Sequence, residues 1–226
     1  MDSLLLVDKP VGCTSHDIVD RVRHALGIRR VGHAGTLDPF ASGLLVIGIG
    51  TGTKALTPLV GENKRYTVTI KLGERTDTFD LEGTITDRMS EETAPPTLEA
   101  IHTALLPFTG TFEQKAPLYS AKKYHGTPLY KLARRGEARE ALRPSKMITI
   151  FSLDLRSYAW PFLELEVQCS SGTYIRSLAD DLGHALGVFG HCIALRRTMV
   201  GTFSVEHALL GDHLTHATIQ EHCITL

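Results

Sequence analysis

The 226-residue sequence predicts an α+β fold built around a mixed β-sheet. Segments with the pattern of β-strands outnumber those with a helical period, and the two kinds do not alternate as they do in a βαβ repeat. A hydrophobic content of 42% with 22% charged residues is typical of a globular protein, and the length suits one substantial domain. We therefore expect a single domain, 1–226, or one domain with a small appendage.

The first half of the chain contains patterns for three strands and one helix. A short apolar run predicts a buried strand at 3–7, and a second run predicts another at 43–49. Between them, Thr14 and Asp17 match a capping box that opens an amphipathic helix. Residues 64–72 alternate between apolar and polar side chains, which predicts a half-buried strand with Tyr66 on its apolar face.

The second half contains patterns for both strands and helices. Its expected elements, in chain order, are a turn or hairpin at 74–92, a helix from Thr97 to about Leu106, strands at 147–158 and 163–169, a helix at 174–186, a strand at 193–205 and a short polar helix after Asp212.

The net charge of −1 conceals two segments of opposite charge. Residues 113–146 hold nine Lys and Arg against three Glu, whereas residues 74–99 hold eight acids against two Arg. A basic segment this dense suits a phosphate backbone, although a solvated helix face would have the same composition.

Several classes of function fit the sequence poorly. No apolar stretch approaches the ~20 residues that span a bilayer, and the N-terminus lacks a basic signal region, so we expect a cytoplasmic protein without a membrane partner. The four cysteines form no C-x-x-C pair, and His213 and His216 lack a third ligand at a recognised spacing, so we expect no metal. The glycine-rich segment 48–54 does not match a nucleotide-binding loop, because Thr53 precedes Lys54 where a Walker loop requires glycine.

One run places a carboxylate in a turn: Gly32-His33-Ala34-Gly35-Thr36-Leu37-Asp38-Pro39. Glycine permits backbone angles closed to other residues, and Pro39 biases Asp38 away from helix. The pattern is compatible with a catalytic carboxylate, but on its own it is more typical of an ordinary Asp-Pro turn.

Three other segments carry side chains that could orient a catalytic carboxylate or bind a base beside it. Lys9 lies in a tight Pro-Gly turn, Tyr66 opens the alternating strand, and Arg176 enters the helix at 174–186. A guanidinium can orient Asp38, and an aromatic ring can stack on a base. Taken singly, Lys9 also fits a surface charge, Tyr66 a core residue and Arg176 a helix-surface ion pair.

Together these segments resemble the TruB family of pseudouridine synthases. The resemblance runs in the family's order through K-P-x-G-x-T-S, G-H-x-G-x-L-D-P-x-A-x-G-L-L, the Lys64-Arg65-Tyr66 strand, Pro117 to Lys123 with Gly126, G-T-Y-I-R-S-L-A-D-D-L-G and Leu195-Arg196-Arg197. Several motifs in order over roughly residues 3–205 are far more specific than any one of them.

The resemblance implies the pseudouridine synthase fold, with a central, mainly antiparallel mixed sheet flanked by helices and an active-site cleft across the sheet. It implies that Asp38 is the catalytic nucleophile that isomerises uridine to pseudouridine, with Arg176 as its ion-pair partner and Tyr66 stacked on the uracil. Tyr174 and Leu195 would line the base pocket and Lys9 would support it. Neither a metal nor an organic cofactor is expected for this isomerisation.

The resemblance also implies which RNA is the substrate and which residues bind it. The family modifies position 55 in the tRNA T-loop, and His33 would fill the space that the flipped nucleotide leaves. The basic insertion at 113–146 would clamp the T-stem-loop, with backbone contacts expected from four side chains: Lys122, Lys123, Arg134 and Arg135. A C-terminal PUA-type domain would be absent or vestigial, and we expect a monomer. A non-catalytic tRNA-binding or tRNA-folding protein on the same fold is the alternative.

Overall fold

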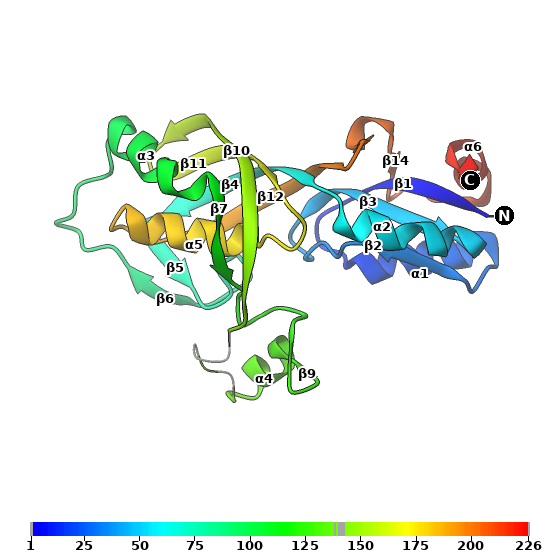
Figure 1. Ribbon diagram of the computed structural model, residues 1–226, viewed down its shortest axis with the longest axis horizontal. Coiled ribbons are helices and arrows are strands. Elements are labelled where there is room, and N and C mark those ends of the chain that lie inside the picture. Colours follow the sequence, from blue (N-terminus) through cyan, green and yellow to red (C-terminus); the bar gives the residue numbers. More distant parts are fainter. Residues whose placement is uncertain (1, 138, 140–142, 226) are drawn as a thin grey trace. The chain divides into compact units, whose positions relative to one another are not determined.

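The computed structural model describes residues 2–137, 139 and 143–225, without the side chain of Lys123. The chain folds into two compact units, of which unit 1 comprises Met1–Thr67 with Leu195–Leu226 and unit 2 comprises Val68–Ala194 (Figure 1). It passes from one unit to the other within β4 (Lys64–Leu72) and again within β12 (Gly190–Val200). Within the described residues, no helix is long and apolar enough to cross a membrane.

Unit 1 combines strands with short helices. Its strands are β1 (Ser3–Lys9), β2 (Val31–Ala34), β3 (Ser42–Ile49), β13 (Phe203–Ser204), β14 (Leu209–Leu210) and β15 (Ile224–Thr225), and its helices are α1 (Ser15–Leu26), the 3₁₀ turn η1 (Gly50–Ala55), α2 (Leu56–Gly61), the 3₁₀ turn η4 (Val205–His207) and α6 (His216–His222). The strand order is β14-β1-β3-β12, with β2 on β3, β13 on β12 and β15 on β1. The β1–β14 and β3–β12 pairs are parallel, and the β1–β3, β2–β3, β1–β15 and β12–β13 pairs are antiparallel.

Both faces of β1 and β3 are covered, which explains their unbroken apolar runs. Leu5, Val7 and alternate residues of β3 pack with Ile18, Val22 and Ile219 from α1 and α6. The intervening residues of β1 and β3 pack in a second cluster with α2, through Leu56. The core therefore holds β1 and β3 rigidly from both sides.

Helix α1 begins where the capping box places it. Thr14 and Asp17 each accept a hydrogen bond from the other's backbone N–H, and Gly27 ends the helix in the left-handed conformation with φ of 67°. These local contacts fix the first turn of α1, where Ser15 lies.

Unit 2 contains a strand order of β12-β4-β11-β10-β7. Its further elements are β5 (Glu74–Thr76), β6 (Ile85–Arg88), α3 (Leu98–Leu105), the 3₁₀ turn η2 (Leu106–Phe108), β7 (Gly110–Lys115), β8 (Lys123–Tyr124), β9 (Thr127–Pro128), α4 (Leu129–Arg134), β10 (Ser145–Ala159), β11 (Phe162–Cys169) and α5 (Ile175–Ala185). The β7–β10 and β10–β11 pairs are antiparallel. The α+β prediction is confirmed, as are the strand at 64–72, the hairpin in the acidic segment and the helices at 98–105 and 175–185.

Two expectations for local structure are wrong. The strand expected at 193–205 is two strands, because Gly201 takes a φ of 55° and turns the chain between β12 and β13. The run that begins at Gly32 is not a turn from its start, because Gly32, His33 and Ala34 lie in β2 and pair with β3. Of its two glycines, only Gly35 uses a left-handed conformation, with φ of 74°.

Candidate active site

The loop that carries Asp38 lies in unit 1, between β2 and β3. It leaves β2 through the left-handed Gly35 and tightens after Asp38, whose carbonyl oxygen accepts a hydrogen bond from the N–H of Ala41 at 3.1 Å. Asp38 is half-buried, whereas Leu37 and Phe40 beside it are buried. The loop therefore inserts two apolar side chains into the core and leaves its carboxylate-bearing residue nearer the surface.

The start of α1 holds the middle of this loop. The buried Ser15 hydroxyl accepts a hydrogen bond from the N–H of Leu37 at 2.8 Å and donates one to its carbonyl oxygen at 3.1 Å. The N–H of Gly12 donates to the carbonyl oxygen of Pro39 at 2.8 Å. The backbone groups on both sides of Asp38 are thus fixed by residues more than twenty positions earlier in the chain.

Lys9 also connects the segment before α1 with the Asp38 loop. Its side chain is completely buried, and Nζ donates to the carbonyl oxygens of Pro10 at 2.8 Å, Cys13 at 2.7 Å and Pro39 at 3.4 Å. Burial lowers the pKa of Lys9, and the charge of Arg197 acts in the same direction, while Cys13 and Asp38 oppose it. The surface-charge interpretation of Lys9 is therefore excluded.

Arg197 binds the two ends of the loop and is a residue that sequence reasoning missed. Its Nε donates to the carbonyl oxygen of Leu44 at 2.8 Å, and its Nη2 donates to that of Gly35 at 3.0 Å. The sequence motif contained Arg197, but nothing in its local pattern distinguished this arginine from its neighbour Arg196, which is half-exposed and ion-paired with Asp8.

His33 lies in β2, on the chain that leads into the loop. Its Nδ1 is buried and, among the described residues, has no hydrogen-bond partner. Burial lowers the pKa of His33 below its ordinary value of 6.5, and the charges of Arg197 and His16 lower it further. The imidazole is therefore held neutral at pH 7.

Two more predicted residues belong to unit 1. Tyr66 is half-buried in β4, and Leu195 is buried in β12. The Thr198 hydroxyl donates to the carbonyl oxygen of Arg65 at 3.2 Å, so the start of β4 runs beside this part of β12. The assignment of Tyr66 and Leu195 to a base pocket stays a prediction.

Arg176 is buried in unit 2, at the start of α5. Its Nη1 lies 3.1 Å from the Oδ2 of Asp80 and donates to the carbonyl oxygen of Thr78 at 2.8 Å. Its Nη2 donates to the carbonyl oxygen of Tyr119 at 3.0 Å. With both charged side chains 5% exposed, the pair is a buried one and not the helix-surface pair that the sequence also allowed. The expected pairing of Arg176 with Asp38 stays a prediction.

Asp80 is the second residue that sequence reasoning missed. Its Oδ1 accepts hydrogen bonds from the Thr78 hydroxyl at 2.6 Å and from the N–H of Glu82 at 3.0 Å, which orients Oδ2 toward Arg176. In the sequence Asp80 is one of eight acids in a segment with a high local charge, and only burial separates it from the others.

Tyr174 precedes α5, and its backbone is held by Gln114 of β7. The side-chain amide of Gln114 donates to the carbonyl oxygen of Tyr174 at 3.0 Å and accepts from its N–H at 2.8 Å. The Ser177 hydroxyl also donates to the carbonyl oxygen of Lys115 at 2.9 Å. The first turn of α5 is therefore fixed against β7 within unit 2.

The basic segment 113–146 runs from β7 through α4 into β10. Lys122, Arg134 and Arg135 are exposed there, and the guanidinium of Arg134 lies 5.6 Å from the ring centre of Tyr130. The side chain of Lys123 and residues 138 and 140–142 lie outside the described part of the chain. Contact of these side chains with an RNA backbone stays a prediction.

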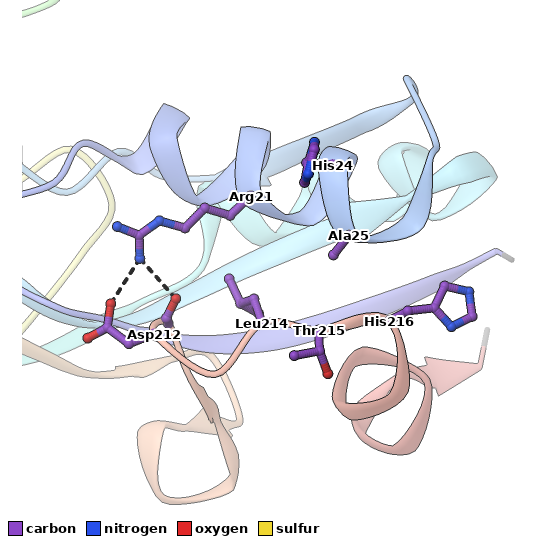
Figure 2. A pocket seen from close by; sticks show the side chains of 8 residues that line it. Arg21, His24, Ala25, Asp212, Leu214, Thr215 and His216 are labelled. Carbon is purple, nitrogen blue, oxygen red and sulfur yellow. Dashed lines mark hydrogen bonds and ion pairs between the residues drawn. The ribbon is translucent and has the colours of Figure 1, made fainter.

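A separate cavity of about 470 Å³ lies in unit 1, between α1 and the segment 211–216 (Figure 2). Arg21 points across it to Asp212, with 3.0 Å between Nη1 and Oδ1, while His24 and His216 lie at its edge. None of the predicted site residues lines it. Within the described residues, no three His, Cys, Asp or Glu side chains gather in a way that suits a metal ion.

Solved structures with the same fold define the class of this protein. The chain superposes on a chain of a structure described as "Crystal Structure of a Cbf5-Nop10-Gar1 Complex" with a TM-score of 0.71 and 26% identity, over 92% of this chain and 52% of that one. A structure described as "Crystal structure of the archaeal box H/ACA sRNP Nop10-Cbf5 complex" gives a TM-score of 0.69 at 21% identity, over 98% and 59%. This chain thus spans just over half of each of those chains, and its fold is the pseudouridine synthase fold.

Sequence comparison then gives the family. The profile of the TruB family pseudouridylate synthase N-terminal domain matches residues 23–175, and that of the tRNA pseudouridylate synthase B C-terminal domain matches residues 176–224. The chain belongs to the TruB family of pseudouridylate synthases, and the enzymes of this class are isomerases.

Curated relatives resemble the chain over nearly its whole length. A protein named tRNA pseudouridine synthase B from Bordetella avium (strain 197N) is 43% identical over 96% of this chain and 88% of its own. One of the same name from Corynebacterium diphtheriae is 46% identical over 93% of this chain and 71% of its own.

Proposed function

We propose that this protein converts uridine to pseudouridine at position 55 in the T-loop of tRNA. The membership of the TruB family and the names of the relatives support uridine in tRNA as the substrate class. The observation that carries the proposal is the loop that holds Asp38, because hydrogen bonds fix its backbone at Gly35, Leu37, Pro39 and Leu44. A carboxylate on a loop fixed in this way is pre-organised for attack on a bound base or sugar, or for elimination at the ribose.

In the proposed reaction, the carboxylate of Asp38 is the nucleophile. Any bond that it forms to the base or to the sugar breaks again before pseudouridine leaves, so the carboxylate is regenerated. The bond between the ribose C1′ and the uracil N1 breaks, the uracil turns, and a bond forms between C1′ and C5. The proton on C5 leaves and N1 gains a proton, so that atoms and electrons balance within the nucleotide. The isomerisation therefore needs no external oxidant or reductant.

Arg176 is proposed to orient Asp38 in the complex with RNA. A guanidinium can bind a carboxylate through two parallel hydrogen bonds, which would orient Asp38 and hold it ionised. Asp80 would fix the plane of the guanidinium, because it is itself held by Thr78 and Glu82. The two carboxylates thus have different proposed tasks, one as nucleophile and one as support.

The remaining predicted residues complete the proposal. Tyr66 would stack on the uracil, with Tyr174 and Leu195 lining its pocket and Lys9 supporting the wall beneath. His33, a half-buried ring whose neutral form is favoured by its surroundings, would take the place of the flipped nucleotide, since a neutral ring inserts into a base stack without carrying a charge into it.

Segment 113–146 would clamp the T-stem-loop through its lysines and arginines. Lys122, Lys123, Arg134 and Arg135 are the proposed backbone contacts. We propose that the enzyme acts as a monomer in the cytoplasm, with neither metal nor organic cofactor.

The test is incubation of the purified protein with an unmodified tRNA transcript, followed by pseudouridine mapping at single-nucleotide resolution. We expect pseudouridine at position 55 and none in a transcript that carries cytidine there. Binding of the transcript without pseudouridine formation would favour the alternative, a non-catalytic tRNA-binding or tRNA-folding protein. Modification at a different uridine would retain the chemistry and overturn the proposed site.

A further inference from the structure

Among the described residues, Arg197 is the largest side chain that is fully buried, with an exposed fraction of 1%. It lies within β12, at the point where this strand pairs in parallel with β3, and its register partner there is Gly43. A buried guanidinium is unusual, because transfer of its charge out of water is unfavourable unless its donors are satisfied. Its two described hydrogen bonds go to backbone carbonyl oxygens on either side of Asp38: that of Gly35, where the Asp38 loop begins, and that of Leu44 in β3, which follows the loop.

The two acceptors lie at opposite ends of that loop. Gly35 is the residue by which the chain leaves β2, and Leu44 lies in β3 after the chain has returned. Because the guanidinium is planar and rigid, two of its nitrogens hold the two carbonyl oxygens at a fixed separation. One side chain therefore bridges the two segments that flank Asp38, in addition to the pairing of β2 with β3.

The loop packs directly on Arg197, without a side chain between them. A Cβ added at Gly43 would lie 2.2 Å from the carbonyl oxygen of Arg197, so β3 approaches β12 more closely than any other residue allows. A Cβ added at Gly35 would lie 3.3 Å from Nη1, at a backbone φ of 74° that also favours glycine. The two glycines and the arginine thus form one close contact.

Lys9 holds the loop at a different place. Its Nζ donates to the carbonyl oxygen of Pro39, directly after Asp38, while Arg197 binds at the two ends. The two cations are near enough for the charge of Arg197 to lower the pKa of Lys9, although burial is the larger cause. Two buried positive charges near one loop repel each other. An apolar side chain of similar volume would fill the site of Arg197 without this repulsion, so packing does not explain why the residue is an arginine.

We propose that Arg197 is a positioning residue for the proposed nucleophile Asp38: it fixes both ends of the Asp38 loop and thereby places the carboxylate for attack. The role assumes the proposed function, in which Asp38 is that nucleophile. Arg197 does not touch the substrate in this proposal, because its side chain is enclosed by the protein.

The test compares Arg197→Met with Arg197→Lys in single-turnover assays with saturating enzyme on an unmodified tRNA transcript. Methionine fills the volume without donating a hydrogen bond, and we expect the rate to fall about 100-fold, since a displacement of about 1 Å has an effect of that size. The Kd for tRNA should change less than about threefold, because no contact with RNA is removed. Lysine keeps a charged donor and should restore part of the rate. A rate for Arg197→Met within about threefold of the wild type would overturn the proposal.

A stability control separates positioning from general destabilisation. Val22→Ala removes buried volume from α1 in the core of unit 1 and should lower Tm while leaving the rate unchanged well below Tm. Equal loss of rate in Val22→Ala and Arg197→Met would show that stability alone is at work. If Arg197→Met does not fold, Gly35→Ala disturbs the same contact from the side of the loop and should slow the same step.

Hydrogen exchange provides a readout that does not depend on activity. The N–H groups of Leu37 and Ala41 are hydrogen-bonded within the loop region and should exchange faster in Arg197→Met, or in Gly35→Ala, but not in Val22→Ala. Unchanged exchange at both groups would overturn the positioning role. A wild-type protein that forms no pseudouridine would instead overturn the proposed function and leave the exchange result to decide whether Arg197 fixes the loop.

Discussion

The Asp38 loop in unit 1 and the Arg176 site in unit 2 are both built on buried cations, but the cations are satisfied in different ways. Lys9 and Arg197 donate to neutral backbone carbonyl oxygens, and so they fix the course of a loop. Arg176 faces the carboxylate of Asp80, and on the same helix Asp180 binds Arg75, with 2.6 Å between Oδ1 and Nε. The difference teaches that the buried cations of the Asp38 loop hold backbone, whereas the Arg176 site in addition neutralises its buried charge with a carboxylate.

We expect the largest effect on the rate from a substitution of Asp38, because it removes the reacting group itself and not a residue that holds the loop. Asp38→Asn keeps the shape of the side chain and removes its charge, and we expect the rate of pseudouridine formation to fall by more than ~10⁴-fold. Loss of a nucleophile has no partial substitute, unlike loss of a loop contact. Single-turnover assays would measure this, with tRNA binding as the control for folding. A rate within tenfold of the wild type would contradict the assignment of Asp38.

The next largest effect is expected on the stability of the protein, from loss of the ion pair between Arg176 and Asp80. Asp80→Asn keeps a side-chain oxygen for Thr78 and Glu82 but leaves the buried charge of Arg176 without this carboxylate. Breaking a buried ion pair from one side typically reduces stability by about 3–5 kcal/mol. Urea unfolding would measure it.

A double-mutant cycle sharpens the same comparison. In Asp80→Asn combined with Arg176→Met, both charges are gone, so the loss should be clearly smaller than the sum of the two single losses. Simple additivity would show that the two side chains are not coupled.

Lys9→Met should reduce stability less than Asp80→Asn. It leaves neutral carbonyl oxygens of Pro10, Cys13 and Pro39 with fewer donors, which amounts to about 1–3 kcal/mol, and removes the unfavourable burial of a charge. Urea unfolding of both variants in parallel would test the order. A loss from Lys9→Met larger than that from Asp80→Asn would contradict the distinction between the two sites.

The smallest expected effect is a pH dependence that arises from His33. Because the pKa of His33 in the folded protein is lowered below 6.5, the unfolded chain binds this proton more readily than the folded one. Stability therefore falls as the pH is lowered through 6.5 and levels off below the pKa of the folded state. His33→Phe keeps a ring without titration, so its stability should depend less on pH between 7 and 5. Identical profiles in thermal melts would count against a lowered pKa of His33 in the folded protein.

Local sequence patterns predicted much of the fold because their causes are local. The capping box at Thr14 and Asp17 starts α1 where expected, and period-two alternation predicted β4 from Lys64 to Leu72. The same patterns failed at Gly201, where one left-handed residue divides a strand, and at Gly32, which is a strand residue and not part of a turn. Periodicity reports which face is buried, and it is insensitive to a single backbone angle.

The sequence by itself determined the order of the motifs, and with it the family, the candidate nucleophile Asp38 and the class of reaction. Only the tertiary structure decided how Asp38 is held. Arg197 is 162 positions from Gly35 and Arg176 is 96 positions from Asp80, so no window of sequence reveals that they meet. Lysines and arginines are usually exposed, and a sequence does not distinguish the few that are buried. Burial makes their hydrogen bonds strong and directional, and burial is a property of the assembled fold.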